Sequence, residues 1–237
     1  MGHRLIRPLR GTITRLLQQQ PKLLPTTNVF LNPNSSRNYI SEMRKEAFEG
    51  NILRLLRNEI QYELDRSPPS QHIPEFNLFI VDEKPGEQWI RLQKKFGETE
   101  DIRVDVTMFD ASVPAKKPGG VVAGGDVQLH ITMIVNVFKG EGSDVLEFIC
   151  SAWPDTIEIR KVFTRGHDRI TAQPYTGPGF KNLDDKLQDS LYDFLETRGI
   201  NDDLAAFLHN YMKNKDKTEF IRWMGTVKSF IEKKQKK

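Results

Sequence analysis

The amino-acid sequence predicts an α+β fold in which an antiparallel sheet is flanked by helices at its two ends. Three observations support this prediction. Residues 41–66 carry helical spacing, residues 76–175 alternate with a period of two, and helical spacing returns after Pro178. No segment within 76–175 is long enough for the helical crossover that joins parallel strands, so consecutive strands should run antiparallel. The 237 residues, of which 38% are hydrophobic, suffice for one domain with a sizeable core.

The first 39 residues have the composition of a disordered mitochondrial transit peptide. They contain no Asp or Glu, and their cations are Arg4, Arg7, Arg10, Arg15, Lys22 and Arg37. Leucine and isoleucine recur among these cations at amphipathic helical spacing, which favours a mitochondrial address over a chloroplast one. An arginine two residues before Tyr39 predicts cleavage near Ile40, which leaves a single α+β domain over residues 40–237. A basic arm that contacts RNA or a membrane directly is the alternative.

Charge and cysteine content narrow the class of protein. The whole chain carries +3, but without the six leader cations 29 Lys and Arg remain against 32 Asp and Glu, so the mature part is acidic, near −3. The single cysteine, Cys150, excludes an intrachain disulfide and a cysteine-rich metal site, and it suits a reducing compartment such as the mitochondrial matrix. No run approaches the roughly 18 apolar residues that a membrane-spanning helix needs. We therefore expect a matrix protein with no membrane span.

The helix over 41–66 has Ser41 as its expected N-cap and ends before Ser67-Pro68-Pro69. Its apolar residues spread over roughly 200° of the helical wheel, which is wider than the stripe of an ordinary surface helix. The helix is therefore either sunk in its own core or shared between its own sheet and a neighbouring subunit. The candidate residues for a subunit contact are Phe48, Ile52, Leu55, Leu56 and Ile60.

The central region reads as a series of strands separated by turn signals. The expected strands are 76–83, 88–96, 100–109, 126–139, 145–153, 156–165 and a weaker seventh near 168–175. In the third strand Ile102, Val104 and Val106 fall on one side and charged residues on the other, so one face of the sheet should be buried and one wet. The glycine- and lysine-containing stretch 112–125 is expected to be a mobile hairpin loop.

The last third of the chain should form two or three helices. The first opens with Asn182 as N-cap, and Gly199 is its expected left-handed cap residue. A second helix covers about 202–213. Asp216 and Glu219 have capping-box spacing and would open a third.

The first of these helices carries a patterned acidic face. Four carboxylates lie within about 80° of one another at helical spacing, with no lysine interleaved. They belong to Asp185, Asp189, Asp193 and Glu196, and leucines and a phenylalanine, including Leu187, run along the opposite side. An ordinary solvated face is one interpretation. A face that binds a cationic partner is the other, because such a partner would relieve the mutual repulsion.

No combination of residues in the sequence predicts catalysis. The glycines near 119–125 lack the strand-to-helix context of a phosphate loop or a dinucleotide fingerprint. The histidines are scattered without metal-ligand spacing, and His130 falls on the solvent side of its strand. Cys150 falls on the buried side and is expected to be a structural thiol. We therefore expect no catalytic site, no cofactor site and no metal site.

Three C-terminal segments, residues 175–200, 204–215 and 219–224, together with the helix around 53–60 and the seven-strand count, carry a resemblance to a known family. They resemble the mitochondrial glycoprotein family, also called the mitochondrial acidic matrix protein family. It implies a homotrimeric ring in the matrix, with a twisted seven-stranded antiparallel sheet in each subunit flanked by one N-terminal and two C-terminal helices. The stretch 112–125 departs from the long, very acidic loop of some relatives, so the resemblance does not extend to ligands that need such a loop.

The resemblance implies no catalytic residues. It implies a chaperone-like protein that binds several partners and supports mitochondrial translation, ribosome biogenesis and the assembly of oxidative-phosphorylation complexes. The acidic face and the net charge of the mature part point to basic segments of mitochondrial proteins as partners. The rival hypothesis is a mitoribosome factor that binds RNA directly through Lys94-Lys95, Lys116-Lys117 and the lysine tail.

Overall fold

The computed structural model describes residues 33–70, 73–116, 122–140, 142, 144–166 and 175–233, which fall into two compact units, residues 1–48 and 49–237. Within the first unit, the described part is the beginning of helix α1 (Pro33–Arg66), and its side chains from Tyr39 to Phe48 are exposed. The sheet and the other helices belong to the second unit.

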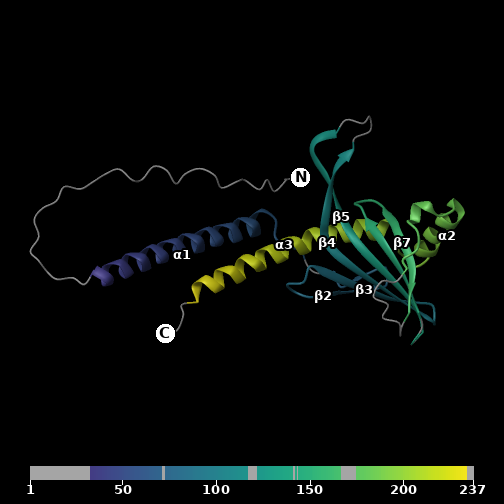
Figure 1. The fold of residues 1–237 in the computed structure, drawn as a ribbon, viewed down its shortest axis with the longest axis horizontal. Coiled ribbons are helices and arrows are strands. Elements are labelled where there is room, and N and C mark those ends of the chain that lie inside the picture. Colours follow the sequence, from purple (N-terminus) through teal and green to yellow (C-terminus); the bar gives the residue numbers. More distant parts are fainter. Residues whose placement is uncertain are drawn as a thin grey trace, which may run out of the picture. The chain divides into compact units, whose positions relative to one another are not determined.

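Seven strands form one sheet in the order in which they occur in the sequence, and each pairs antiparallel with the next (Figure 1). The strands are β1 (Glu75–Phe76), β2 (Phe79–Glu83), β3 (Trp89–Phe96), β4 (Glu100–Lys116), β5 (Val122–Lys139), β6 (Val145–Ala152) and β7 (Ile157–Arg165). Helices α2 (Asp185–Glu196) and α3 (Asp202–Glu232) follow, with a short 3-10 turn, η1 (Phe180–Asn182), before them. This confirms the predicted α+β class and the seven-stranded antiparallel sheet.

The number of strands agrees with the prediction, but two of the strands differ from the predicted ones. The single strand expected over 76–83 is wrong, because Asn77 (φ 47°) and Leu78 (φ 70°) form a tight turn that splits it into β1 and β2. The alternation of apolar residues hides this turn, since a two-residue hairpin with left-handed backbone normally carries Asn-Gly. The seventh strand expected near 168–175 lies outside the described residues except for Tyr175, which is in no strand.

The stretch expected to be a loop over 112–125 is largely strand. β4 continues to Lys116 and β5 starts at Val122, so only residues 117–121 between them lie outside the described residues. The pairing of the two strands shifts register after Val106, after Phe109 and after Pro114. Bulges of this kind interrupt the period-two pattern while the pairing continues. The glycines and lysines of the stretch suggested a loop, and the interrupted alternation gave no sign that the strands continue into it.

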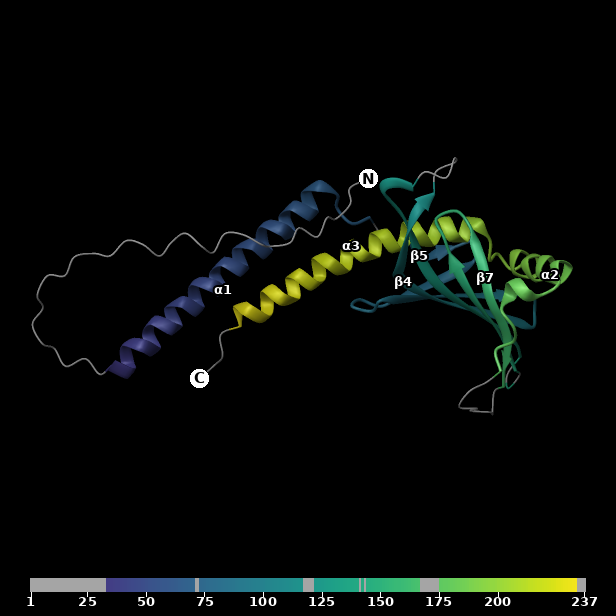
Figure 2. The same cartoon turned by 45° about the horizontal axis from the view of Figure 1, so that its top comes forward.

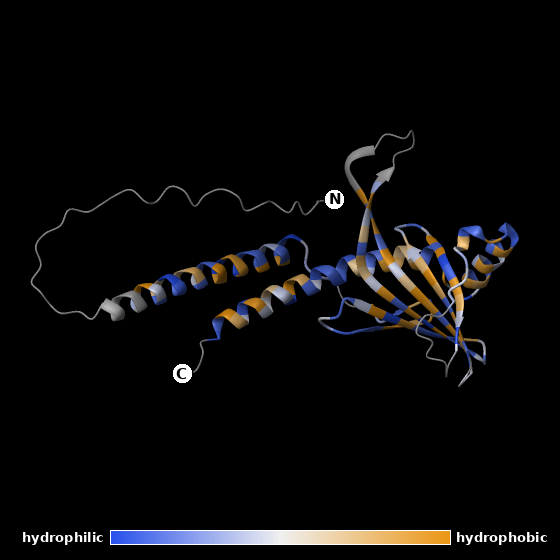
Figure 3. Ribbon diagram, in the orientation of Figure 1, coloured by the Kyte–Doolittle hydropathy of each residue, from blue (hydrophilic) through white to orange (hydrophobic). Residues whose placement is uncertain are grey.

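One face of the sheet forms the core together with α3, the inner side of α2 and the η1 turn. We call it the covered face. The strands show the alternating hydropathy that such one-sided burial requires (Figure 3). On this face Ile102, Val104 and Val106 are fully buried, as predicted. They belong to a continuous cluster with Leu204, Leu208 and other residues of α3. We call the opposite side, which neither α2 nor α3 covers, the open face.

Helix α3 is one continuous helix, so the predicted break between 213 and 216 and the capping box at Asp216 and Glu219 are wrong. The residues between 213 and 219 include neither glycine nor proline, and nothing else there forces the helix to end. Asn201 is the N-cap instead, and its side chain accepts a hydrogen bond from Leu204 N. Figure 2 shows α3 running along the sheet and continuing past its strands.

Two predicted helix starts also move. α1 begins at Pro33 rather than at Ser41, because proline is well tolerated in the first turn of a helix and no breaker follows it. It therefore includes residues 33–39 of the expected leader, while residues 1–32 lie outside the described part. α2 has Asp184 rather than Asn182 as its N-cap, and Asp184 Oδ1 accepts from Lys186 N at 3.1 Å. The helix ends are as predicted: α1 ends at Arg66, and Gly199 (φ 82°) terminates α2.

A buried charge network fixes α3 against the sheet. The side chain of Lys215 is fully buried, and its Nζ lies 3.0 Å from Glu83 Oε1 on β2 and 3.4 Å from Glu219 Oε1. Tyr211 donates a hydrogen bond to the same Glu83 carboxylate. Because burial and this negatively charged partner both disfavour the phenolate, the pKa of Tyr211 is raised. The polar network sits among apolar side chains, so it defines the register of α3 on β2.

Replacing Leu78 by glycine should stabilise the protein. The left-handed backbone at Leu78 strains a residue with a β-carbon, and glycine removes that strain at some cost in unfolded-state entropy. We expect the free energy of unfolding to rise by about 0.5–1 kcal/mol, measured by urea denaturation. Ile80→Gly is the control, because Ile80 lies in a strand without a positive φ, and it should be destabilising. A Leu78→Gly variant no more stable than the parent would contradict the expected strain.

Candidate functional site

The four carboxylates predicted to form an acidic face all lie exposed on α2. Asp185, Asp189, Asp193 and Glu196 follow one another along this helix and are all solvent-accessible. None of them forms an ion pair or a side-chain hydrogen bond with any residue in the described part of the chain. We call these four residues the acidic face. No described residue pairs with these charges, which leaves them available to a cation from outside.

The inner side of α2 holds the helix on the protein. Leu195 is fully buried, Leu191 and Phe194 pack partly buried against the core, and the Phe194 ring stacks on Phe148 of β6 with centroids 5.9 Å apart. Leu187 was expected on this apolar side but is 47% exposed, so the packed side is narrower than predicted. Leu187 is therefore exposed to solvent on the side of α2 opposite the acidic face, rather than packed in the core.

Arg198 clamps the C-terminal end of α2 to the sheet. Its Nη2 lies 2.8 Å from Glu100 Oε2 at the start of β4, and its Nη1 donates to Phe194 O at 2.9 Å. The guanidinium also lies over the Phe194 ring, 3.5 Å from its centroid. Arg198 is only 9% exposed. Because a buried ion pair with additional hydrogen bonds resists distortion, the acidic face is presented on a fixed support.

An acidic cleft extends the acidic face. A cleft of about 500 Å³ opens between β7, the end of α2 and the start of α3, and its carboxylates are Glu158, Glu196, Asp202 and Asp203. Two of these have partners: Asp202 Oδ1 accepts from Ile157 N at 3.2 Å, and Glu158 lies 3.3 Å from Arg160. Glu196 belongs to both the acidic face and the cleft. The two features therefore form one continuous negative surface.

Three residues of the acidic cleft were missed by the sequence analysis. Asp202 and Asp203 follow the Asn201 N-cap, and acidic residues in a first turn are ordinarily explained by the helix dipole. Glu158 lies on an outward position of β7, where a charged residue is also unremarkable. Their convergence depends on how β7 approaches the two helices, and no local pattern encodes that approach.

The five residues expected to form a subunit contact on α1 divide into two groups. Phe48, Ile52 and Leu55 are exposed by 69%, 43% and 53%, whereas Leu56 and Ile60 are partly buried. Tyr62, about two helical turns after Leu55, is 52% exposed. Arg57 of the same helix pairs with Glu232 of α3 at 2.8 Å. α1 thus carries large apolar side chains that this subunit does not bury.

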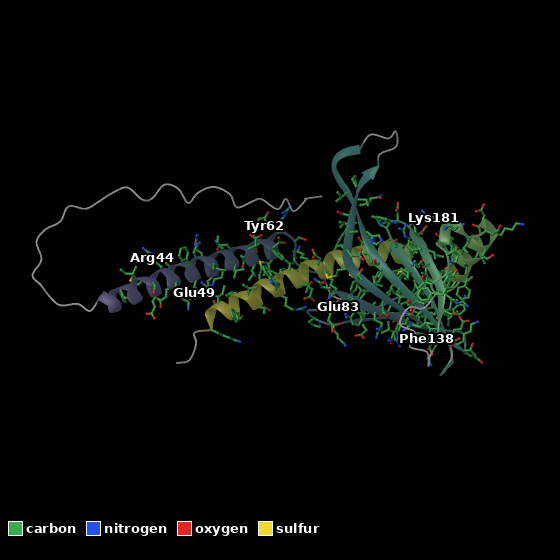
Figure 4. All side chains as sticks on the ribbon, in the orientation of Figure 1. Arg44, Glu49, Tyr62, Glu83, Phe138 and Lys181 are labelled. Atoms are coloured by element: carbon green, nitrogen blue, oxygen red, sulfur yellow. The ribbon has the colours of Figure 1, made fainter. Side chains whose placement is uncertain are left out.

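Figure 4 shows side chains on all the described elements, among them Tyr62 on α1 and Lys181 before α2. The cations of the RNA hypothesis are only partly described. Lys94 Nζ donates to Arg198 O at 3.4 Å and lies over the Phe79 ring, while Lys95 is exposed on β3. Lys116 ends β4, and Lys117 and the lysines after residue 233 lie outside the described residues.

No acid, base and nucleophile set is expected from the sequence, but hydrogen bonds join Asp110, His130 and Ser151 in the structure. His130 Nδ1 lies 2.6 Å from Asp110 Oδ1, and His130 Nε2 lies 2.8 Å from Ser151 Oγ. Burial raises the pKa of Asp110, but hydrogen bonds from Thr132, His130 and Thr107 lower it further than burial raises it. Ser151 is only 5% exposed. Its hydroxyl is not presented to a ligand, so we interpret the set as a cross-link between β4, β5 and β6.

The single cysteine is a buried thiol. Cys150 is buried on the covered face as predicted, and burial raises the pKa of its thiol to about 12, which suppresses the thiolate. Within the described ranges, no group of three or more His, Cys, Asp and Glu side chains is arranged to hold a metal ion. Of the helices that the structure describes, none is both long and apolar enough to cross a membrane.

Comparison with known proteins identifies relatives over most of the chain. The family model described as mitochondrial glycoprotein matches residues 56–231. An uncharacterized mitochondrial protein of Arabidopsis thaliana is 30% identical over 214 residues, which cover 85% of each chain. The mitochondrial acidic protein mam33 of Schizosaccharomyces pombe is 25% identical over 211 residues, 76% of this chain and 77% of the relative.

Two solved structures share the fold. The p22 protein of Trypanosoma brucei has a TM-score of 0.63 at 22% identity, covering 78% of this chain and 99% of its own. A hypothetical protein of Leishmania major, described as a sequence homologue of human p32 protein, has a TM-score of 0.59 at 20% identity, covering 77% and 98%. At these identities the likeness concerns the fold alone, and it agrees with a seven-stranded sheet flanked by one N-terminal and two C-terminal helices.

Neutralising the acidic face should not destabilise the protein. Asp189, Asp193 and Glu196 repel one another at three- and four-residue spacing and gain nothing from the helix N-terminus. The triple variant Asp189→Asn, Asp193→Asn, Glu196→Gln should have a free energy of unfolding equal to or up to about 1 kcal/mol above that of the parent. Chemical denaturation at low ionic strength measures this difference. A loss of more than about 1 kcal/mol would mean that the carboxylates serve the fold.

Proposed function

The chain belongs to the mitochondrial glycoprotein family, and on that premise we propose that it is a non-enzymatic protein that binds basic segments of other mitochondrial proteins. The observation that carries the proposal is the acidic face, four exposed carboxylates on one helix with no partner in the described part of the chain. The acidic cleft adds further carboxylates beside it. Basic segments of unassembled or newly made proteins have the charge that such a surface attracts.

The rigidity of the surface supports binding rather than turnover. Arg198 and the packed side of α2 hold the four carboxylates on a fixed frame, so a partner pays little to order them. The serine of the Asp110, His130 and Ser151 set is buried, which argues against a role as a nucleophile. We infer a chaperone-like holding role in mitochondrial translation, ribosome biogenesis and the assembly of oxidative-phosphorylation complexes.

The relatives and the family are named as mitochondrial, and the chain is accordingly a mitochondrial protein. We propose the matrix as its compartment, with residues 1–39 acting as a removable leader. The leader has the cationic, acid-free composition that import signals share. Its removal leaves an acidic mature protein, which fits the proposed attraction of basic partners.

We further propose that the mature protein is a homotrimer. A helix that exposes Phe48, Ile52 and Leu55 carries more apolar surface than a solvated helix ordinarily shows. Identical copies would cover that surface, and a closed ring of three would cover it on every copy.

The acidic face should determine peptide binding. For the variant Asp185→Asn, Asp189→Asn, Asp193→Asn, Glu196→Gln, we expect the dissociation constant of a fluorescent arginine-rich peptide to rise about tenfold or more, measured by fluorescence anisotropy. Parental binding should weaken steadily as NaCl is added, because salt screens exposed charges.

The matched control for this variant removes the same charge from other exposed carboxylates, through Asp82→Asn, Glu98→Gln, Asp144→Asn and Asp216→Asn. It should bind the peptide as the parent does. Equal loss in both variants would point to net charge rather than to the acidic face. Tight binding of an RNA oligonucleotide by the leaderless protein, with no binding of the peptide, would favour the RNA hypothesis instead.

Charges on the exposed side of α1 should dissociate the oligomer. Ile52→Lys with Leu55→Lys places two cations where we propose an apolar contact, and desolvating them costs more than the contact returns. Sedimentation velocity should then shift from a trimer to a folded single subunit at micromolar concentration. Asn58→Lys with Gln61→Lys adds the same charge to polar positions of α1 and should leave the trimer intact. A parent protein that already sediments as one subunit would overturn the proposal.

A further inference from the structure

An open groove of about 1030 Å³ crosses the strands on the open face of the sheet, away from the acidic face. Its described walls come from β2 to β5 and the turn after β5, near Phe138 (Figure 4). Its apolar side chains include Leu78, Ile80 and Phe138, and its cations include Lys95 and Arg103. Among the described lining residues Asp101 is the one carboxylate and Lys94, Lys95 and Arg103 are the cations, so the described lining is positively charged on balance.

Arg103 is the unusual cation of the open face. It is partly buried, and its guanidinium lies over the Phe138 ring, 5.1 Å from the centroid. It forms no hydrogen bond or ion pair with any residue in the described part of the chain. Other arginines on this face are paired, Arg91 with Asp105 at 2.6 Å and Arg165 with Glu147 at 3.2 Å. A partly buried guanidinium whose donors have no acceptor among the described residues is costly, and an anion from outside would satisfy them.

The apolar wall of the groove also costs the protein stability, because it exposes large apolar side chains and includes a strained backbone position. Leu78 is 71% exposed and Ile80 is 64% exposed. Leu78 occupies the left-handed turn position that glycine would fill without strain. Strained residues that the fold itself does not need tend to gather at binding sites. The exposed leucine and isoleucine therefore suit the apolar part of a ligand.

The strand register sets the distance between the apolar wall of the groove and the Arg103 guanidinium. Ile80 lies opposite Gln93, and Gln93 lies opposite Arg103, so these residues form one row across three strands. Lys95 and Phe138 both lie opposite Asp101 in the adjoining row. Two strand spacings separate Ile80 from Arg103, about 10 Å. That distance suits an alkyl chain on the apolar wall whose headgroup reaches the guanidinium.

We propose that this groove binds an anionic amphiphile, a single aliphatic chain that carries a carboxylate or phosphate headgroup. The headgroup contacts Arg103 and Lys95, and the chain lies on Leu78 and Ile80. A peptide fits less well, because an added peptide strand needs an unpaired sheet edge. The groove crosses β2 to β5, whose backbones are already paired with their neighbours.

The test is calorimetric titration of the full-length protein with dodecanoate, dodecyl phosphate and the neutral dodecanol, each below its critical micelle concentration. At least one of the two anionic probes should bind, and dodecanol should bind at least tenfold more weakly. The probe that binds more tightly identifies the headgroup. Equal binding of dodecanol would overturn the assignment of Arg103 as an anion site.

Two variants separate ligand contacts from general effects on the fold. Arg103→Gln should weaken binding of the anionic probe at least tenfold, whereas Lys161→Gln, which removes the same charge elsewhere on the open face, should leave it unchanged. Leu78→Gly should bind several-fold more weakly although it unfolds at higher urea concentration. Equal binding by the two charge variants, or undiminished binding by Leu78→Gly, would contradict the proposal. The acidic-face variant should bind the probe normally, so this test is independent of peptide binding.

Discussion

The packing of α3 against one face of the sheet is the constraint on which the rest of the structure depends. Apolar side chains from β2 to β7 meet Leu204, Leu208 and Met212 of the helix and are fully buried. Each large apolar side chain buried in this way contributes about 1.5–3 kcal/mol, so this contact dominates the stability of the second unit. Since neither α2 nor α3 covers the opposite face, its strands must carry residues that tolerate water, and that is where the charged rows and the groove occur.

The same constraint explains why a lysine lies buried in the middle of α3. A helix on a twisted sheet could slide along its axis with little loss of apolar contact, because leucine and methionine accept many neighbours. The ion pair of Lys215 with Glu83, joined by the Tyr211 hydrogen bond, has only one satisfactory position. Such a network adds little net stability, but it selects one register among several similar ones.

Local patterns predicted the parts of the fold that depend on local physics. Period-two alternation identified the sheet, and three- and four-residue spacing identified the acidic face on α2, because both are properties of a single element. The turn at Asn77 and Leu78 escaped because leucine stands where glycine is usual, and the bulges of β4 disguised a strand as a loop. The acidic cleft, and the position of Arg103 with no partner among the described residues, depend on which strands and helices meet, so no single segment of sequence could indicate them.

Arg198 ties α2 to β4 so firmly that the carboxylates beyond it stand on a rigid platform rather than on a flexible arm. Contacts between exposed charges are individually weak. A rigid surface does not enclose the bound segment, and it needs no conformational change to release it. A protein held there would be captured quickly through long-range attraction and released within a short residence time. If the proposed function holds, such a negative surface binds a cationic chain transiently and keeps it in solution until a partner of higher affinity binds it.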